Sequence, residues 1–281
     1  MTEIGQPAGP TITEESHPHL IKEPFATYLE RGKTTLRSHP LALFRKSPFQ
    51  YKAEQDGVSH VVDSKPLSFG RATHSLILEG APALWADYTR VPEELRTMNK
   101  NKKEYQTWKK EQTKFVLSEE EWIALQHMQS NVSAHESASG LLTGGLAERT
   151  VTAEYCGRKC QIRIDYFNNH IVDLKSCRDL DWFEYDARKF EYGHQLAFYR
   201  SVYSAACQDE FPPYVYIIAV ESVAPYRVGV FKLDDDWLAL GCKENERAIK
   251  KIDECEDFEF WPTGFEKMRR LGFYNPSFEG E

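Results

Sequence analysis

The chain has 281 residues, of which 41% are hydrophobic and 13% aromatic, and its formal net charge is −8. This composition is enough for one sizeable hydrophobic core. No run of about 18 apolar residues occurs, and the N-terminus has no basic flank followed by an apolar stretch, so neither a membrane span nor a secretory signal is expected. We therefore predict a cytoplasmic protein without a membrane partner. The net charge argues against nucleic acid as a partner, but a local basic groove would escape this count.

The N-terminal half is predicted to be mainly helical. Residues 1–20 are rich in Pro, Thr and Glu without periodicity, which is typical of a flexible arm. A single domain is expected over residues 21–281, with its helical part at 21–146. The first predicted helix carries Leu41 and Phe44 and ends at a turn after residue 46. Beside this turn, Arg45 and Lys46 are candidate contacts for a DNA phosphate, with a solvated basic pair as the alternative.

A second helix of about ten residues lies in SFGRATHSLILEG and stops at Gly80. It contains His74, and Arg71 on the same helix is a further candidate DNA contact. Residues 92–114 follow as the most basic stretch of the chain, with Arg96 and six lysines. Such a run is either a solvated face or a surface that attracts a polyanion. Ser118 then begins another helix with a capping box.

From residue 147 onward the hydrophobic period changes to two. AERTVTAEYC, RKCQIRIDYF and HIVDLKSC are predicted to be three strands joined by tight turns. One helix of about 24 residues from Phe183, two more strands and a C-terminal helix complete a βββαββα core over residues 147–281. The predicted fold is therefore α/β, with a mixed central sheet flanked by helices and a helical N-terminal region.

The third strand of this core places two charges among apolar residues. Asp173 and Lys175 are two positions apart and project from one face of the strand, whereas Leu174 faces the other way. Antiparallel pairing with the preceding strand can bring Asp165 alongside Asp173. Such a cluster is costly to bury without a partner for its negative charge, and a divalent cation is the simplest partner. Oxygen ligands favour Mg²⁺ or Mn²⁺ over zinc.

Polar residues of the following helix extend this pattern. Tyr192, Gln195 and Tyr199 have the spacing that puts three side chains on one stripe of a helix. Glu148, at the start of the first strand, adds another acid. On its own, an Asp-x-Lys strand is more often a structural ion pair than a site, so the order of all these residues matters more than any one of them.

Taken together, LSFGRATHSLILE, AERTVTAEY, CQIRIDYF, IVDLKSC and YGHQLAFYRSVY closely resemble the nuclease domain of the RecE-type exonucleases (exonuclease VIII) and their phage relatives. These belong to the RecB-like branch of the PD-(D/E)XK superfamily, although Ile164 stands where the superfamily name has proline. The resemblance covers roughly residues 35–275. It implies a restriction-endonuclease-like core and a Mg²⁺-dependent 5′-to-3′ exonuclease, with Mn²⁺ as a substitute. The expected substrate is the end of double-stranded DNA, left with a 3′ single-stranded overhang for recombination by annealing.

The same resemblance implies a role for each candidate residue. Asp165, Asp173, the Leu174 carbonyl and His74 would hold the metal, and Glu148 would assist. Lys175 would orient the attacking water and stabilise charge on the phosphate. A further group is expected to position the lysine or the DNA strand: Gln195, Tyr199 and Tyr192. The expected partners are a single-strand annealing protein and further copies of this chain in a ring, taken to be a tetramer.

Three alternatives stay open at this point. Another RecB-branch nuclease is one, but the CRISPR-associated iron–sulfur type needs a cysteine far upstream, and no cysteine precedes Cys156. A non-catalytic DNA-binding protein with a vestigial site is the second. A purely structural α/β domain is the third, and it explains neither the buried charges nor their order. A metal clip at Cys156 and Cys160 is conceivable, but no second pair has zinc-like spacing.

Overall fold

The computed structural model describes residues 12–58, 65–96, 98–208 and 212–269. Its centre is a six-stranded sheet with the order β1-β4-β5-β6-β7-β8. β6 and β7 run parallel, and every other neighbouring pair in this sheet is antiparallel. The strands are β1 (Ile21–Lys22), β4 (Leu146–Tyr155), β5 (Arg158–Phe167), β6 (Ile171–Cys177), β7 (Val215–Glu221) and β8 (Val228–Lys232). The predicted mixed α/β sheet is confirmed, and β1 is an edge strand that the sequence pattern did not predict.

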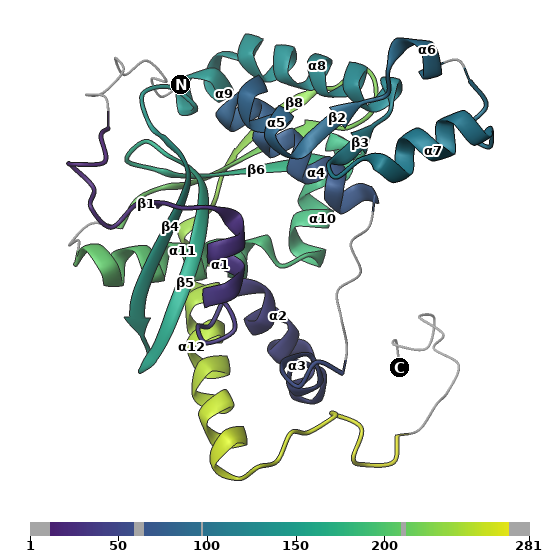
Figure 1. Cartoon of the computed structure of the whole chain (residues 1–281). Coiled ribbons are helices and arrows are strands. Elements are labelled where there is room, and N and C mark those ends of the chain that lie inside the picture. Colours follow the sequence, from purple (N-terminus) through teal and green to yellow (C-terminus); the bar gives the residue numbers. More distant parts are fainter. Residues whose placement is uncertain (1–11, 59–64, 97, 209–211, 270–281) are drawn as a thin grey trace, which may run out of the picture.

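Helices cover both faces of the sheet (Figure 1). On the N-terminal side they are α1 (Phe25–Arg31), α2 (Ser38–Lys46), α3 (Pro48–Gln55), α4 (Lys65–His74), a π-helical turn (Ser75–Glu79), α5 (Ala81–Asp87), α6 (Glu93–Arg96), α7 (Lys103–Glu111), α8 (Glu119–Ala134) and α9 (Glu136–Leu141). After β6 come a 3₁₀ turn (Leu180–Trp182), α10 (Phe183–Lys189), α11 (Tyr192–Cys207) and, after β8, α12 (Asp235–Asp257).

The side-chain alternation along β6 divides the core into two layers. Ile171 packs into a large cluster with α2, α11 and α12, whereas Val172 and Leu174 pack into a second cluster with α8 and α9. Figure 1 shows α4, α8 and α9 on one side of β6 and α11 and α12 on the other. The side of β6 that faces α11 therefore lies inside the molecule, and any charged side chain on that side is buried. This is the position of Asp173 and Lys175.

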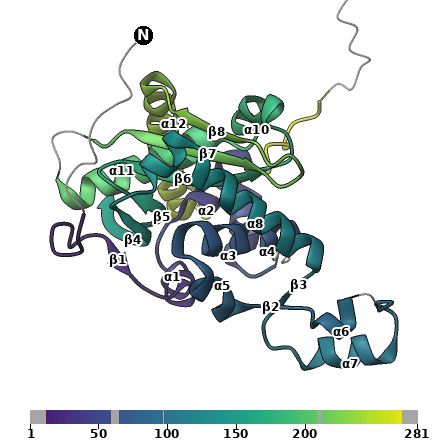
Figure 2. The same cartoon turned by 90° about the horizontal axis from the view of Figure 1, so that it is seen from above.

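Two short strands outside the main sheet were not predicted. β2 (Tyr88–Arg90) and β3 (Phe115–Leu117) form a parallel ladder of their own. Together with α6 and α7 they make a helical arm, residues 88–117, that projects from the body of the molecule (Figure 2). A third apolar cluster, which includes Leu84, Tyr88, Leu117 and Leu125, fixes the root of this arm against α4 and α8.

The single long helix predicted from Phe183 is wrong, because the structure breaks it into α10 and α11 at Glu191. Glu191 has φ 57, in the left-handed region, and its carbonyl accepts the first backbone hydrogen bonds of α11. Arg45 of α2 holds this break by donating to the Glu191 carboxylate at 2.6 Å. Because no Gly or Pro marks the position, the sequence pattern gave no sign of it. The break makes Tyr192 the first residue of α11, next to Lys175.

Part of the predicted N-terminal arm lies outside the described residues, namely 1–11. In the described part, Ile12 and Leu20 are buried in the core, and Glu14 pairs with Arg149 at 2.6 Å. Among the described residues, no helix is both long and apolar enough to cross a bilayer.

Candidate active site

Three carboxylates lie in one row across β4, β5 and β6. Glu148 falls between the paired positions Ala147↔Tyr166 and Arg149↔Ile164, so it is opposite Asp165. Continuing the register of β5 and β6, in which Tyr166 pairs with Val172, puts Asp165 opposite Asp173. The row therefore forms where three consecutive strands meet, as the hairpin turns of the sequence predict for the last two.

The hydrogen bonding between β5 and β6 ends at this row. The ladder contains only Tyr166↔Val172 and Phe167↔Ile171, and at the next step the Asp165 carboxylate takes the place of a backbone acceptor. The Leu174 amide donates to Asp165 Oδ2 at 2.7 Å. The two strands can therefore separate without leaving a buried N–H without an acceptor. The divergence opens space for the side chains of the row.

Glu148 has an unusual backbone conformation. Its φ is 52, in the left-handed region, which costs about 1–2 kcal/mol for a residue with a side chain. Arg163 holds the Glu148 carboxylate in place by donating from Nε to Oε2 at 2.6 Å. The other oxygen of Glu148 faces His74, with Oε1 at 3.7 Å from Nδ1. The role of Arg163 was not anticipated, although its place on the strand facing β4 could have indicated it.

Lys175 and Asp173 form a buried ion pair. Lys175 Nζ lies 2.6 Å from Asp173 Oδ2, and the Asp173 side chain is only 3% exposed. The ammonium also lies over the ring of Tyr192, 4.9 Å from its centroid, in a cation–π contact. Although burial opposes the charge, Asp173 and Asp165 outweigh it and raise the pKa of Lys175 above its usual value. The lysine is therefore held as a cation at the end of the carboxylate row.

His74 completes a group with the geometry of a metal site. It ends α4 at the junction with the π-helical turn, and its Nδ1 lies 3.5 Å from Asp165 Oδ2. Donor atoms of His74, Glu148 and Asp165 all lie within 4.8 Å of one another. This group contains Glu148, while Asp173 pairs with Lys175. Metal binding by Asp173 and by the Leu174 carbonyl stays a prediction. Leu174 contributes its amide to Asp165.

The charges in this group oppose one another. Burial, together with Asp173 and Glu148, raises the pKa of Asp165 to about 7 despite the nearby His74. Burial would lower the pKa of His74, but Asp165 and Glu148 outweigh it and raise that pKa to about 9. The protein thus crowds acids together and offsets part of their repulsion with a protonated histidine. A divalent cation would offset it more completely.

Gln195 and Tyr199 lie on the stripe of α11 that follows Tyr192. The Gln195 amide donates to the Tyr199 hydroxyl at 3.4 Å. Tyr199 is buried, and burial, together with Tyr28, Asp165 and Asp173, raises its pKa well above the usual value. It therefore stays a neutral hydroxyl near the acids. A direct role of either residue toward DNA stays a prediction.

The other predicted DNA contacts have different surroundings. Arg45 is largely buried, and besides Glu191 it donates to Asn245 at 2.5 Å, so it joins α2 to α11 and α12. Lys46 is exposed at the end of α2. Arg71 lies with its guanidinium over the ring of Phe115, 5.4 Å from the centroid, and so connects α4 to the helical arm.

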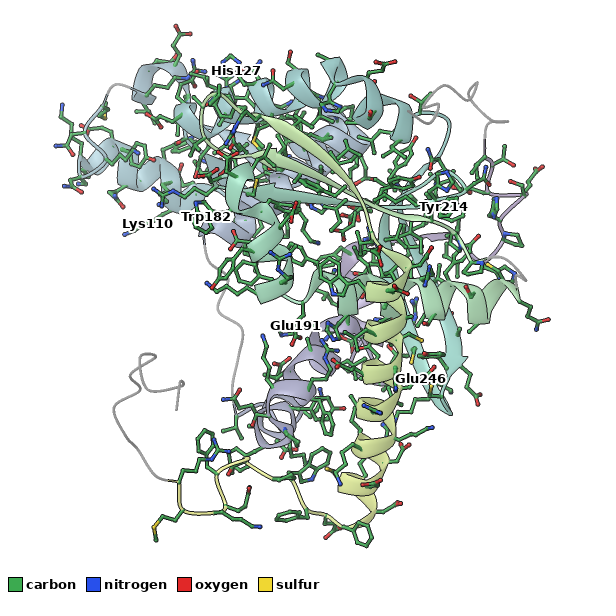
Figure 3. All side chains as sticks on the ribbon, turned by 180° about the vertical axis from the view of Figure 1, so that it is seen from behind. Lys110, His127, Trp182, Glu191, Tyr214 and Glu246 are labelled. Carbon is green, nitrogen blue, oxygen red and sulfur yellow. The ribbon has the colours of Figure 1, made fainter. Side chains whose placement is uncertain are left out.

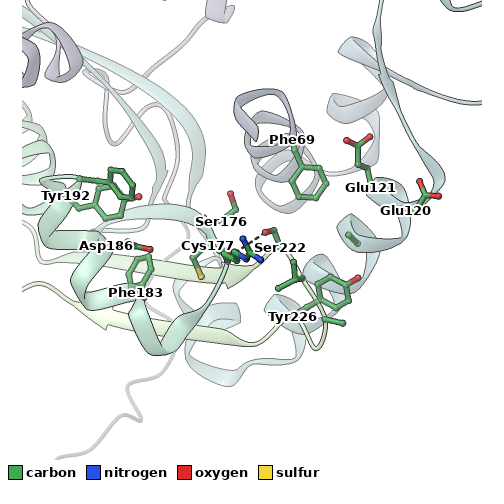
Figure 4. A pocket seen from close by; sticks show the side chains of 15 residues that line it. Phe69, Glu120, Glu121, Ser176, Cys177, Phe183, Asp186, Tyr192, Ser222 and Tyr226 are labelled. Carbon is green, nitrogen blue, oxygen red and sulfur yellow. Dashed lines mark hydrogen bonds between the residues drawn. The ribbon is translucent and has the colours of Figure 1, made fainter. Parts of the chain in front are cut away.

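A cavity of about 700 Å³ lies beside Lys175. Figure 4 shows Tyr192 and Phe183 at one side of it and Phe69 with Glu121 at the other. Ser176, which follows Lys175 on β6, also lines it. Tyr192 thus borders the cavity and contacts Lys175 at the same time. The cavity is large enough for a nucleotide-sized group.

The comparisons with known proteins agree with this geometry. A family model described as "PDDEXK-like domain of unknown function (DUF3799)" matches residues 40–271. The chain belongs to this PDDEXK-like family. The predicted PD-(D/E)XK superfamily is therefore confirmed, and the matched range includes Asp165, Asp173 and Lys175. No curated protein matches the chain.

A solved structure has the same fold as this PDDEXK-like protein. It is the crystal structure of a "Putative exonuclease" from Eubacterium rectale, with 14% sequence identity and a TM-score of 0.65. The match covers 90% of this chain and 97% of that one. At this identity the similarity establishes the fold of the PDDEXK-like domain and not its activity.

The donor set fits a hard divalent cation. Two carboxylates and one imidazole supply oxygen and nitrogen ligands, and thiolates, which would select zinc, are not part of the group. Burial is the main cause of the raised pKa of Asp165, with Asp173 and Glu148 adding to it, so a cation beside this carboxyl would favour its ionised form. His74, Glu148 and Asp165 are therefore the residues that would hold Mg²⁺ or Mn²⁺, with Asp173 adjacent.

The metal-free protein is expected to lose stability as the pH rises from 7 to 9. His74 has a folded-state pKa of about 9, above its unfolded value, so the folded state binds more protons than the unfolded state in this range. The stabilising charge of His74 is complete below the unfolded pKa and is lost as the pH passes through about 9. The loss that comes from Asp165 lies mainly at lower pH, between its ordinary pKa of 3.8 and about 7, so the change from pH 7 to 9 reports His74. Thermal unfolding in EDTA at pH 7, 8 and 9 measures this.

Saturating Mn²⁺ should remove this loss, because the ligands must be deprotonated to bind the metal. His74→Gln, which cannot be protonated, should make the curve in EDTA flatter. A melting temperature that stays constant or rises with pH in EDTA would show that His74 does not titrate as described.

Proposed function

We propose that this protein is a Mg²⁺-dependent deoxyribonuclease that hydrolyses phosphodiester bonds at the ends of double-stranded DNA. The observation that supports it best is the lysine held 2.6 Å from Asp173, beside a potential metal site of His74, Glu148 and Asp165. A structural ion pair would account for Asp173 and Lys175 alone. It would not account for a second group of buried acids at the same place, or for the left-handed backbone of Glu148.

Each residue of the site has a role in this proposal. A divalent ion bound there supplies positive charge to the phosphate and lowers the pKa of a coordinated water. Asp165, Glu148 and His74 would hold the ion, and Arg163 keeps the Glu148 carboxylate in place. Lys175 holds its ammonium toward the scissile phosphate and stabilises the negative charge that develops there.

The finer assignment rests on the resemblance to RecE-type exonucleases. We propose 5′-to-3′ degradation of one strand, which leaves a 3′ single-stranded overhang for recombination by annealing. Mn²⁺ is expected to replace Mg²⁺. Cytoplasmic localisation, a single-strand annealing protein as partner and a ring of copies of this chain, taken as a tetramer, belong to the same proposal.

Digestion of linear and closed circular duplexes side by side tests the function. With Mg²⁺, a linear duplex labelled at one 5′ end should release label as mononucleotides or short products, and the circle should stay intact. EDTA should abolish the reaction. Cleavage of the circle at an equal rate would favour another RecB-branch nuclease, and duplex binding without cleavage in any metal would favour the non-catalytic alternative.

A further inference from the structure

The helical arm, residues 88–117, is basic in an otherwise acidic protein. It contains eight arginines and lysines against four glutamates, a net charge of +4, whereas the whole chain carries −8. We propose that the arm is a contact surface for the phosphate backbone of duplex DNA ahead of the cut. This rests on the proposed function, because it assigns the substrate of that same site a second contact.

The arginines at the root of the arm serve its attachment. Arg90 and Arg96 both pair with Glu119 at the start of α8, at 3.0 and 3.2 Å. The guanidinium of Arg90 also lies 5.0 Å from the ring centroid of Trp122. These contacts, with the parallel ladder of β2 and β3, fix the direction of the arm. The root is therefore a rigid support and not the proposed DNA contact.

The lysines further out have no such partners. Lys100, Lys102, Lys103, Lys109 and Lys110 are all exposed. Within the described ranges, no carboxylate lies within ion-pair distance of their ammonium groups, whereas Lys22, Lys33, Lys52 and Lys251 each have one. Lys110 is at the outer edge of the molecule in Figure 3. Five exposed cations without an ion-pair partner in the described ranges, on one projecting element, fit a polyanion better than an interface with an ordinary protein surface.

The arm is connected to the site through α4. Arg71 of α4 lies over Phe115 of β3, and His74, one turn further along α4, belongs to the metal group. Figure 2 shows α6 and α7 beyond this connection, away from the sheet. A duplex is stiff, so one whose end is at His74 holds its phosphates along a fixed line that a projecting rigid arm can contact, whereas a flexible single strand has no fixed direction. Duplex DNA is therefore the occupant that fits.

Neutralising the outer lysines tests this. Four charges on α7 and at the residue before it are removed together in one variant: Lys102→Gln, Lys103→Gln, Lys109→Gln and Lys110→Gln. Binding to a duplex is measured as a function of salt in Ca²⁺ without turnover. If each lysine neutralises one phosphate, the slope of log K against log salt should fall in magnitude by about 3–4. KM for long linear duplexes should rise at least 10-fold while kcat changes little.

A control with the same charge change lies on the opposite face of the sheet. Lys243→Gln, Arg247→Gln, Lys250→Gln and Lys251→Gln remove four exposed cations from α12. The proposal is overturned if the arm variant keeps the salt slope of the unmodified protein. It is likewise overturned if the arm variant loses no more duplex affinity than this control does. A loss of affinity for single strands equal to the loss for duplexes would also overturn it. Because binding is read without cleavage, a protein that binds in this way but never cleaves would refute the proposed function and not the arm.

Discussion

Asp173→Asn and Lys175→Met are each expected to reduce the rate of DNA hydrolysis by about 10³-fold or more. Both changes remove a charge that the site offers to the phosphate or to the metal, and loss of one such group costs about two to three orders of magnitude in other hydrolases. The measurement is single-turnover cleavage of end-labelled linear duplex at saturating Mg²⁺. Activity within 10-fold of the unmodified protein would show that the pair is structural.

Each of the same two changes should also lower the free energy of unfolding. Comparison with the double variant then shows whether the two residues act as an ion pair. Asp173 is 3% exposed and Lys175 17% exposed, so either single change leaves a buried charge without its partner. This costs about 3–5 kcal/mol for a buried pair. The double variant, Asp173→Asn with Lys175→Met, removes both charges and should be more stable than either single variant. It should remain inactive, which separates the loss of activity from unfolding.

A control on the neighbouring strand is also a buried carboxylate in an ion pair, but it lies outside the proposed site. Glu221 of β7 is buried, pairs with Arg227 at 2.7 Å and accepts from the Leu180 amide at 3.0 Å. The hydrogen bond from Arg227 is the largest cause that lowers its pKa to about 2. Glu221→Gln should therefore lower the melting temperature while leaving hydrolysis within a few fold of the unmodified protein.

The strands that carry the candidate site could be predicted from the sequence because their pattern is local. Alternation with period two, two tight turns and the spacing of Asp165, Asp173 and Lys175 are enough to bring the last two strands together at the correct residues. The final helix and the capping box at Ser118 are local in the same sense. In each case the residues that decide the structure are neighbours along the chain.

The features that escaped prediction depend on residues far apart. β2 and β3 are three residues each, and they pair across the whole of α6 and α7. The break at Glu191 is held by Arg45, which is distant in sequence. Likewise, whether Glu148 or Asp173 joins His74 and Asp165 depends on which acid Lys175 and Arg163 engage. Composition and periodicity carry no information about such choices.

Asp165→Asn should have opposite effects on activity and on the stability of the metal-free protein. Asn can still accept the hydrogen bond from the Leu174 amide, so the divergence of β5 and β6 is preserved. The substitution removes a carboxylate whose pKa is raised to about 7, chiefly by burial and then by Asp173. At pH 8 the unmodified protein must ionise this group at a cost on the order of 4 kcal/mol. The variant should therefore melt several degrees higher in EDTA.

The gain should disappear when metal is added. Mn²⁺ is expected to stabilise the unmodified protein, because it binds the folded state alone, and to stabilise Asp165→Asn little or not at all. Hydrolysis should fall by about 10³-fold, as for the other acid. Thermal unfolding at pH 8 with EDTA and with Mn²⁺ gives both comparisons. A variant that melts lower than the unmodified protein in EDTA, as Asp173→Asn should, would mean that Asp165 stabilises the fold and is not held there for a cation.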